Sequence, residues 1–436
     1  MVKFKVLLGT YTLFLILLCV PWKYIYSATY SFNKIIDSKT FIPETEFVFK
    51  RWNPPQINHG NIAFLGEDIS GHFGIYLFTN GTLSKIVDEK TVIPNTRCTF
   101  TVISSFSLFQ NNIAFRAEGS RSVWDSLNSR KAPEGIWLWK NGDIEKIVGP
   151  EMTASGSNNA LGGIGFWQFA LNGNSVVFPH GGLHQIGPKK TIFQSPVIYL
   201  AESGKIKKLI NSNSLTTQGV GKITFLGLGN SSFHAGKLAF MARNENRNTI
   251  IYQYDNKGVK FIADGYTQIP EGHGTFTVIR PPAQSYGNIV FQADGDNQKG
   301  IYHYRDGKLL KVVDLGTPIS ENSDHFTHFH IHPSIYKETI AFLGFQKFIP
   351  YKPPELRTLE ESKVQNWASL QKAGIYIFQK GKIYKVIENG DTLDGKIVNT
   401  VSISENCLSM SLLAFSVGFS DGSHAIYTAA INQSDN

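Results

Sequence analysis

Seven copies of a short apolar phrase that ends in Phe constrain the fold of this chain more than any other feature of its sequence. The copies are Asn61–Phe64, Asn112–Phe115, Ser175–Phe178, Lys237–Phe240, Asn288–Phe291, Thr339–Phe342 and Leu412–Phe415. Each copy is followed by Ile-Tyr or a close variant, usually by a tight turn such as Asn-Gly or Asp-Gly, and in most copies by a third run such as Lys-Ile-Val. β-branched and aromatic residues dominate these runs, and Gly, Pro, Asn and Asp separate them, which is typical of short strands joined by turns.

A further strand is predicted ahead of each apolar phrase. Phe49, Phe100, Phe225 and Phe276 each precede the Phe of the next phrase by 15 residues. The phrases themselves recur every 51 to 73 residues. Four strands per unit and a period near 50 predict a β-propeller with one blade per unit. No long stretch has helical periodicity, although one short helix is expected within residues 356–372.

The two ends of the chain predict how the propeller closes. The last repeat stops after its third strand, near Ile431, whereas residues 33–43 match the fourth-strand segment 84–94 without any strand of their own unit before them. The N-terminal strand therefore completes the last blade, and this pairing removes an exposed sheet edge. We predict an all-β fold, a closed seven-bladed β-propeller with four antiparallel strands per blade, over roughly residues 31–431.

The repeat also supports a resemblance to known proteins. The unit that runs from Asn288–Phe291 through Ile301-Tyr302 to Lys311–Asp314 resembles the repeats of secreted bacterial β-propeller proteins, most of which are uncharacterised. It is loosely similar to TolB-like repeats, which also combine an Ile-Ala-Phe strand with an Ile-Tyr strand, but it lacks their Ser-Pro-Asp-Gly turn. The resemblance implies the propeller fold over nearly the whole chain. Because its motifs are structural, it implies no catalytic residue.

The N-terminal segment has the pattern of a signal peptide. Met1–Lys5 is basic, Val6–Val20 is apolar, and Ser27-Ala28 offers small residues for cleavage. We predict a leader over residues 1–28, with an uncleaved membrane anchor as the alternative, and a single propeller domain over residues 29–436. This interpretation predicts a secreted or periplasmic location.

Composition argues against several classes of function. Cys98 and Cys407 are separated by a blade in the repeat alignment, so neither a disulfide nor a Cys-based metal site is expected. The formal net charge of +8 is spread over single Lys residues at strand starts, so no nucleic-acid partner is expected. No membrane contact beyond the leader and no stable oligomer are predicted. The sequence contains no Walker loop, Rossmann pattern or zinc-protease motif.

Long connections gather on one face of the predicted propeller. The second-to-third-strand connections of blades 2, 3 and 6 emerge on the same face as the fourth-to-first-strand connections, which are long at blades 3 and 4. The insertions span residues 120–134, 180–196 and 346–373. Trp124 and Trp367 lie in the first and last of them, where such rings stack on sugars, anchor a protein partner or cap their own loops. This long-loop face is the expected functional surface.

A histidine cluster stands out on the first strand of the sixth blade, in the segment His325–His332. In a regular strand, His328, His330 and His332 share one face with Phe326 and line the central channel. Three interpretations stay open. The histidines are polar channel lining, they hold a divalent metal, or one of them forms an acid–base pair with a carboxylate from another blade.

Other candidate residues follow from the repeat alignment. Arg280 in blade 5 and Ser104 in blade 2 occupy the position of His330 in blade 6, and His180 begins the insertion of blade 3. A second set lies three residues after the Phe of the apolar phrase and is expected near the rim of the long-loop face: Glu67, Glu118, Arg243 and Asp294. Paired carboxylates there would serve a hydrolase, whereas the alternative is that they cap turns.

These patterns predict a binding protein. The expected partner is a glycan, a cell-envelope component or a protein, held on the long-loop face with His328, His330 and Arg280 at the channel mouth. The alternative is a polysaccharide lyase or hydrolase that uses His, Arg and carboxylate groups. A deep polar channel would favour the enzyme, and a plugged channel would favour the binding protein. No cofactor is evident in the sequence, and a divalent metal at the histidines is the one that the pattern allows.

Overall fold

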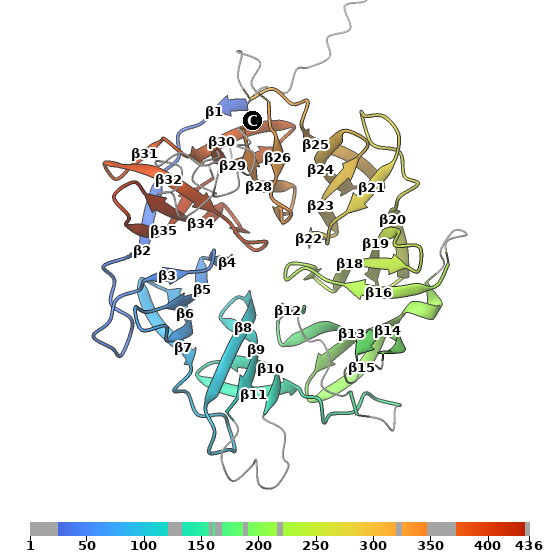
Figure 1. Ribbon diagram of the computed structural model, residues 1–436, viewed down its shortest axis with the longest axis horizontal. Coiled ribbons are helices and arrows are strands. Elements are labelled where there is room, and N and C mark those ends of the chain that lie inside the picture. The colour runs from blue at the N-terminus through green and yellow to red at the C-terminus, as the bar shows by residue number, and fades with distance from the viewer. Residues whose placement is uncertain are drawn as a thin grey trace, which may run out of the picture.

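The computed structural model describes residues 25–120, 133–156, 160–161, 168–185, 191–215, 221–319, 325–346 and 372–431. Over these residues the chain forms seven small sheets arranged as blades around a central axis (Figure 1). The predicted all-β, seven-bladed propeller is therefore confirmed. The one helix among the described residues is the short 3-10 helix η1 (Ser212–Ser214), and the helix expected within residues 356–372 falls almost entirely outside them.

Each blade consists of four antiparallel strand positions that follow one another outward from the axis. The first four blades contain β3 (Arg51–Trp52), β4 (Gln56–Asn58), β5 (Asn61–Glu67), β6 (Phe73–Thr79) and β7 (Thr82–Asp88); β8 (Phe100–Phe109), β9 (Asn112–Gly119), β10 (Glu134–Lys140) and β11 (Asp143–Val148); β12 (Ala170–Asn172), β13 (Ser175–Gln185), β14 (Thr191–Glu202) and β15 (Lys205–Asn211); and β16 (Ile223–Gly227), β17 (Phe233–His234), β18 (Lys237–Asn244), β19 (Thr249–Asp255) and β20 (Gly258–Ala263).

Blades 5 to 7 follow the same plan and include the two N-terminal strands. They contain β21 (Phe276–Ile279), β22 (Ala283–Ser285), β23 (Asn288–Gly295), β24 (Gln298–Arg305) and β25 (Lys308–Asp314); β26 (His328–Phe329), β27 (Ser334–Tyr336), β28 (Thr339–Phe345), β29 (Ala373–Gln379), β30 (Lys382–Glu388) and β1 (Ile25–Ser27); and β31 (Thr392–Leu393), β32 (Lys396–Ser402), β33 (Leu408–Ser409), β34 (Leu412–Phe419), β35 (His424–Ala430) and β2 (Phe32–Asp37).

The repeated aromatic residues build the core between neighbouring blades. The Phe of the apolar phrase is fully buried in every blade, and in blade 1 Phe64 lies directly opposite Tyr76 with stacked rings 5.7 Å apart. Phe49 meets the Tyr76 ring edge-on at 4.9 Å. Each such aromatic pair adds about 0.5–1.5 kcal/mol beyond the area that it buries. The same contacts recur around the ring, so the period in the sequence becomes a continuous core of interblade clusters.

Tight turns join the outer strands, as the sequence predicts. Asn80 and Gly81 have φ angles of 50° and 80°, and Asn141 and Gly142 have 51° and 95°. These positive angles belong to the hairpin turns whose twist matches that of the flanking strands. Short hairpin turns therefore connect the outer strands on the face opposite the long connections.

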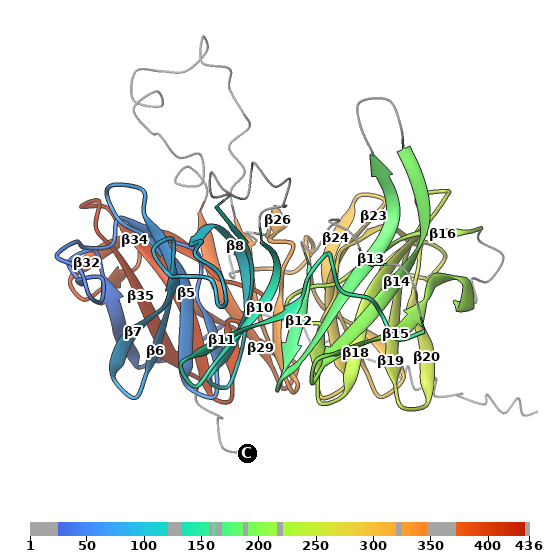
Figure 2. The ribbon, with the colours of Figure 1, turned by 90° about the horizontal axis from the view of Figure 1, so that it is seen from below.

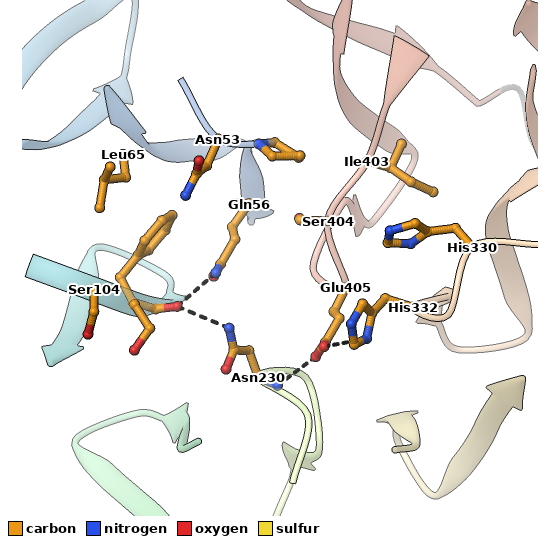
Figure 3. Close-up of a pocket in the computed structure, with 13 residues that line it drawn as sticks. Asn53, Gln56, Leu65, Ser104, Asn230, His330, His332, Ile403, Ser404 and Glu405 are labelled. Carbon is orange, nitrogen blue, oxygen red and sulfur yellow. Dashed lines mark hydrogen bonds and ion pairs between the residues drawn. The ribbon is translucent and has the colours of Figure 1, made fainter. Parts of the chain in front are cut away.

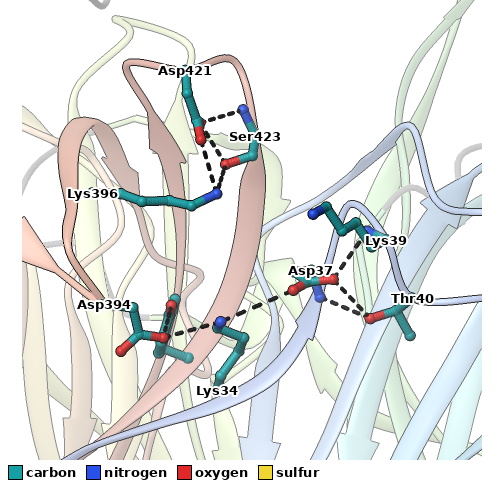
Figure 4. A network of polar contacts seen from close by, with 9 residues as sticks. Lys34, Asp37, Lys39, Thr40, Asp394, Lys396, Asp421 and Ser423 are labelled. Atoms are coloured by element: carbon teal, nitrogen blue, oxygen red, sulfur yellow. Dashed lines mark hydrogen bonds and ion pairs between the residues drawn. The ribbon is translucent and has the colours of Figure 1, made fainter.

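The ring closes through the N-terminal strand. Strand β2 pairs antiparallel with β35, and Ile36 lies opposite Ile426 in the core. A polar network ties the same ends together, with Lys34 Nζ 3.0 Å from Asp394 Oδ2 (Figure 4). The Tyr427 hydroxyl donates to that carboxylate at 2.8 Å. The predicted closure between the chain ends is confirmed.

Strand β1 is a feature that the sequence pattern did not predict. Ile25–Ser27 pairs parallel with β30 on the outer edge of blade 6, and the Tyr26 ring lies 5.6 Å from the Tyr384 ring. These residues fall inside the predicted leader. Residues 1–24 lie outside the described part of the chain, so the leader and its cleavage stay predictions. No helix among the described residues is long and apolar enough to cross a membrane.

The insertion of blade 3 has regular structure. Strands β13 and β14 continue past the usual blade height and rise from the long-loop face as a hairpin (Figure 2). Their register shifts between His180 and Gly182. The other two insertions lie outside the described residues except at their ends, and Trp124 and Trp367 are not among the described residues.

Candidate functional site

The site begins where the innermost strands break. In blade 6 the chain leaves β26 at Phe329 and resumes β27 only at Ser334. Pro residues occupy these breaks in blades 1, 5 and 6, at Pro54-Pro55, Pro281-Pro282 and Pro333. Pro has no N–H to donate to a strand ladder, so the strand cannot continue through it. Because these strands are the innermost of their blades, the residues at the breaks lie around the central axis.

A pocket of about 290 Å³ lies among these breaks (Figure 3). Its lining comes from blades 1, 2, 4, 6 and 7: Asn53, Pro54, Gln56, Leu65, Ser104, Ser105, Phe106, Asn230, His330, His332, Ile403, Ser404 and Glu405. The innermost strands run away from the long-loop face, and most of the lining residues precede the second half of those strands. The pocket thus lies on the long-loop side of the axis. We call it the axial pocket.

A loop of blade 4 forms the floor of the axial pocket. The Asn230 backbone N–H donates to Glu405 Oε2 at 2.6 Å, and its Nδ2 lies 3.5 Å from the Phe106 carbonyl oxygen. Glu405 belongs to blade 7 and Phe106 to blade 2, so this loop spans the axis. Asn230 also lines a smaller cavity of about 40 Å³ on the opposite side. The central channel is therefore interrupted at Asn230.

The approach of this loop requires Gly229. A Cβ atom at that position would lie 2.7 Å from Glu405 Oε2 and 3.1 Å from the Pro282 carbonyl oxygen. The first distance is shorter than real Cβ contacts and the second is tighter than most of them, so a side chain at this position would displace the Glu405 carboxylate. The absence of a side chain at Gly229 lets a peptide N–H reach the carboxylate of the opposite blade.

Gln56 joins blades 1 and 2 beside this floor. Its side chain is buried, donates from Nε2 to the Phe106 carbonyl oxygen at 2.8 Å and accepts from the Leu108 N–H at 2.9 Å. Both ends of the amide are thus satisfied, as a buried polar group requires. The wall of the pocket on this side is fixed.

A histidine and a carboxylate meet across blades 6 and 7. His332 Nδ1 lies 2.7 Å from Glu405 Oε1, while Glu405 Oε2 accepts from Asn230. The structure therefore contains a cross-blade His–carboxylate pair of the kind that the sequence left open. Both carboxylate oxygens have partners, which fixes the Glu405 side chain.

His330 lies next to this pair. Its ring centroid is 5.5 Å from that of His332. Burial, reinforced by the neighbouring His332, lowers the pKa of His330 to about 4, so its imidazole is neutral at pH 7. Within the described part of the chain, His330 Nδ1 and the Ser105 hydroxyl are buried polar atoms without a hydrogen-bond partner.

The alternation expected along the histidine segment does not hold. His328 stacks on Phe345 with ring centroids 3.9 Å apart and planes within 6° of parallel, and it does not line the axial pocket. Phe326 is buried between Phe342 and Tyr376 instead of facing the channel. The reason is that β26 covers only His328 and Phe329. Phe326 precedes this strand and His330 and His332 follow it, so strand alternation does not relate the four side chains. Across the described residues, no group of three or more His, Cys, Asp or Glu side chains is arranged to hold a metal ion.

The predicted correspondence between His330 and Arg280 is confirmed by the backbone. The N–H of His330 donates to the Leu343 carbonyl oxygen at 2.9 Å, and the N–H of Arg280 donates to the Gln292 carbonyl oxygen at 3.0 Å. Each acceptor follows the buried Phe of its blade. Arg280 nevertheless does not line the axial pocket. In blade 2 the predicted position, Ser104, is wrong by one residue, because Ser105 lies opposite Arg116, which follows the buried Phe115; both serines line the pocket.

The predicted rim residues are engaged within their own blades. The contacts are Arg51 with Glu67 at 2.6 Å, Arg116 with Glu118 at 2.6 Å, Gln292 with Asp294 at 2.6 Å, and Arg243 over the Phe225 ring at 5.1 Å. None of these contacts joins two blades. His180 is likewise buried within blade 3, with its ring 6.1 Å from that of Tyr199. The structure does not bring these residues to the axial pocket.

Comparison with known proteins adds a family but no activity. Residues 25–246 and, in an overlapping second match, residues 112–347 fit the model of a family of unknown function, DUF7453. Overlapping matches of this kind are typical of an internal repeat. No curated protein matches the sequence.

Solved structures with a similar fold include peptidases. A post-proline cleaving enzyme from Rickettsia typhi is 12% identical, with a TM-score of 0.45 over 87% of this chain and 51% of that chain. The acylaminoacyl peptidase of Pyrococcus horikoshii is 13% identical, with a TM-score of 0.43 over 77% of this chain and 45% of that chain. The β-propeller domain of the Trilobed protease from Pyrococcus furiosus is 12% identical, with a TM-score of 0.34 over 79% of this chain and 100% of that chain. The chain spans about half the length of the first two enzymes, and the likeness carries nothing about activity.

Proposed function

The chain belongs to DUF7453, a family of unknown function, and we propose from the geometry of the axial pocket that it is a secreted or periplasmic glycan-binding propeller. The location rests on the leader pattern of residues 1–28. The binding role rests on the chemistry of the pocket, which lies at the centre of the face where the long connections emerge.

The observation that best supports glycan binding is a pair of polar atoms without hydrogen-bond partners, on two residues that line a small pocket with both polar and apolar walls. His330 Nδ1 and the Ser105 hydroxyl are buried without partners among the described residues. Each such group costs about 1–3 kcal/mol when it is left unsatisfied. Both residues line the pocket, so we propose that their side chains turn toward a bound sugar, whose hydroxyl groups then supply the missing hydrogen bonds. Pro54 and Ile403 offer apolar surface to the C–H faces of the ring.

A hydrolase that uses two carboxylates fits this pocket less well. Among the described lining residues Glu405 is the single carboxylate, and His332 and Asn230 already occupy both of its oxygens. Glycosidases of the common kind need two carboxyl groups about 5–10 Å apart. The rim acids Glu67 and Glu118 are paired within their own blades.

A polysaccharide lyase is the second candidate, and the His332–Glu405 pair favours it. A carboxylate that holds Nδ1 orients an imidazole so that Nε2 can act as a base. A lyase would release an unsaturated sugar with new ultraviolet absorbance. Because such an elimination needs a uronate beside the bond that breaks, incubation of the protein with uronate-containing polysaccharides separates the two candidates.

The test of binding is a thermal-shift screen of the purified chain against mono- and oligosaccharides. A ligand at a hundredfold excess over Kd adds about 2.7 kcal/mol to stability, which is a clear shift in Tm. We expect the double variant Ser105→Ala/His330→Ala to abolish the shift. The control His273→Ala, which removes an exposed histidine outside the pocket, should retain it. A screen without any shift, or a shift that the double variant retains, contradicts the proposal and directs the search to a protein partner.

A further inference from the structure

We propose that the axial pocket takes an uncharged sugar at the end of a glycan chain, and that it rejects internal and acidic sugars. This inference rests on the proposed glycan binding and adds the class of ligand and its direction of entry. Three features of the pocket support it: a closed floor, a small volume and the lack of a cation among its described lining residues.

The closed floor decides between a chain end and a chain interior. Asn230 contacts blade 7 through Glu405 and blade 2 through Phe106, so its loop blocks the axis below the pocket. Gln56 joins blades 1 and 2 at the same level. A glycan cannot thread through the ring past these contacts. The long-loop side is the exit that remains, and a pocket of about 290 Å³ suits one outgoing chain better than two, so we infer that the bound sugar is terminal.

The volume limits the occupant to a small group. The pocket measures about 290 Å³, which is close to the lower end of the range of roughly 300–1,000 Å³ found for small-molecule sites. A space of this size suits a single sugar ring better than several. The β13–β14 hairpin rises from the same face (Figure 2), and we propose that it is an element that meets further sugars.

The charges of the pocket select against acidic sugars. Its described lining contains no Lys or Arg, and it contains the Glu405 carboxylate. The imidazole of His332 is already engaged by Glu405, and burial keeps His330 neutral at pH 7. A uronate or sialate carboxylate would enter without a cation to pair with and would be repelled by Glu405. A neutral sugar meets hydroxyl, amide and imidazole groups instead.

The test uses isothermal titration with matched sugars. The probes are glucose, galactose, mannose and N-acetylglucosamine, the uronates of glucose and galactose, and linear oligomers of the neutral sugars. We expect the uronates to bind at least tenfold more weakly than their neutral parents. We also expect the affinity per chain to stay within about threefold as the oligomer lengthens, because each chain has one end of the right kind, whereas internal binding makes the affinity per chain grow with the number of rings.

Two variants test the effect of charge in the pocket, whichever neutral sugar binds. Glu405→Gln should lower the ratio of the affinity for a neutral sugar to the affinity for its uronate at least fivefold. If Glu405→Gln fails to fold, Ser105→Lys places a cation in the pocket and should raise uronate binding relative to neutral sugar by a similar factor. Tighter binding of uronates by the unaltered chain, or affinity that grows with the number of rings, overturns this inference and leaves glycan binding in place. Failure of every saccharide to bind overturns both.

Discussion

At the scale of single residues, Glu405 joins the two sides of the ring. Its carboxylate accepts from the Asn230 N–H of blade 4 and lies 2.7 Å from His332 of blade 6. The side chain is largely buried, with 18% of its surface exposed. Hydrogen bonds to a charged group contribute more than neutral ones, and breaking one inside a protein leaves a donor unsatisfied. Glu405 therefore supports both the floor and the wall of the axial pocket.

We expect Glu405→Ala to lower the free energy of unfolding by about 2–3 kcal/mol, because the Asn230 N–H and His332 lose their acceptor. Urea denaturation measures this change. Glu338→Ala is the matched control, since Glu338 is 60% exposed and pairs with Arg305 on the surface, where such pairs contribute about 0–1 kcal/mol. Equal effects of the two substitutions would show that Glu405 does not brace the ring.

His303 gives the protein a pH dependence of stability. The residue is 2% exposed, and burial lowers the pKa of its imidazole to about 4. The unfolded chain, with the ordinary value of 6.5, binds a proton more readily than the folded chain. Stability therefore falls as the pH drops from 6.5 toward 4, and His330 acts in the same direction.

We expect His303→Leu to flatten this dependence. Leu77, Leu138 and Leu200 occupy the same strand position in blades 1 to 3, so the core has a precedent for Leu. Between pH 7 and pH 5 the unaltered chain should lose about 1–2 kcal/mol more than the variant. Urea denaturation at the two pH values measures the difference, and parallel losses would contradict the assignment.

At the scale of elements, the sequence predicts the strands that lie inside blades better than those at the axis. The second strand of each blade carries an uninterrupted apolar phrase such as Asn61–Phe64, and its pairing partner carries Ile75-Tyr76, so the pattern and the structure agree. The first strand is different, because its backbone hydrogen bonds stop at segments such as Pro54-Pro55, which have no N–H groups. The alternation assumed for His328 and His330 fails there, since the backbone turns toward the axis.

The edge of blade 6 holds the other unpredicted element. Strand β1 is only three residues long and pairs in parallel with β30. Its sequence has no alternation of apolar and polar residues that would predict a strand. Ile25 packs against the cluster between blades 5 and 6. Composition alone places this segment in the leader pattern, whereas in the structure it belongs to a sheet.

We expect Ile25→Asp to lower the free energy of unfolding of the unprocessed chain by about 1–2 kcal/mol, because it places a charge against apolar side chains. Ile69→Asp is the control, as Ile69 is 72% exposed and should change stability by less than about 0.5 kcal/mol. Urea denaturation compares the two. An Ile25→Asp variant as stable as the control would mean that β1 contributes nothing to the fold.

At the scale of the whole molecule, the ring is what assembles the site. The axial pocket takes Asn53, Ser105, Asn230, His330 and Glu405 from five blades that are far apart in sequence, and the N-terminal strand β2 closes the ring that holds them. The repeat predicts the number of blades and their closure because each blade repeats the same local chemistry. It does not predict the pocket, because the lining residues differ from blade to blade and meet only when all seven blades are in place.

The pocket could have been sought in the sequence at one kind of position. Glu405, Asn230 and His332 all lie just before the second half of the innermost strand of their blades. The residue type at this place differs between blades, whereas the sequences of the flanking strands repeat. Polar residues that differ from blade to blade, within a repeat whose strands stay similar, therefore indicate positions near the central axis. Which of them bond one another depends on the reach of the blade 4 loop, and that reach depends on Gly229.

The most direct test of the axial pocket as a glycan site is a crystal structure of the chain with the neutral sugar that binds most tightly in the titrations. We predict one sugar ring above Asn230, with hydroxyl groups within hydrogen-bond distance of His330 Nδ1 and the Ser105 hydroxyl. A sugar bound elsewhere, on the β13–β14 hairpin or on the outer face of a blade with the axial pocket free of it, would contradict this prediction.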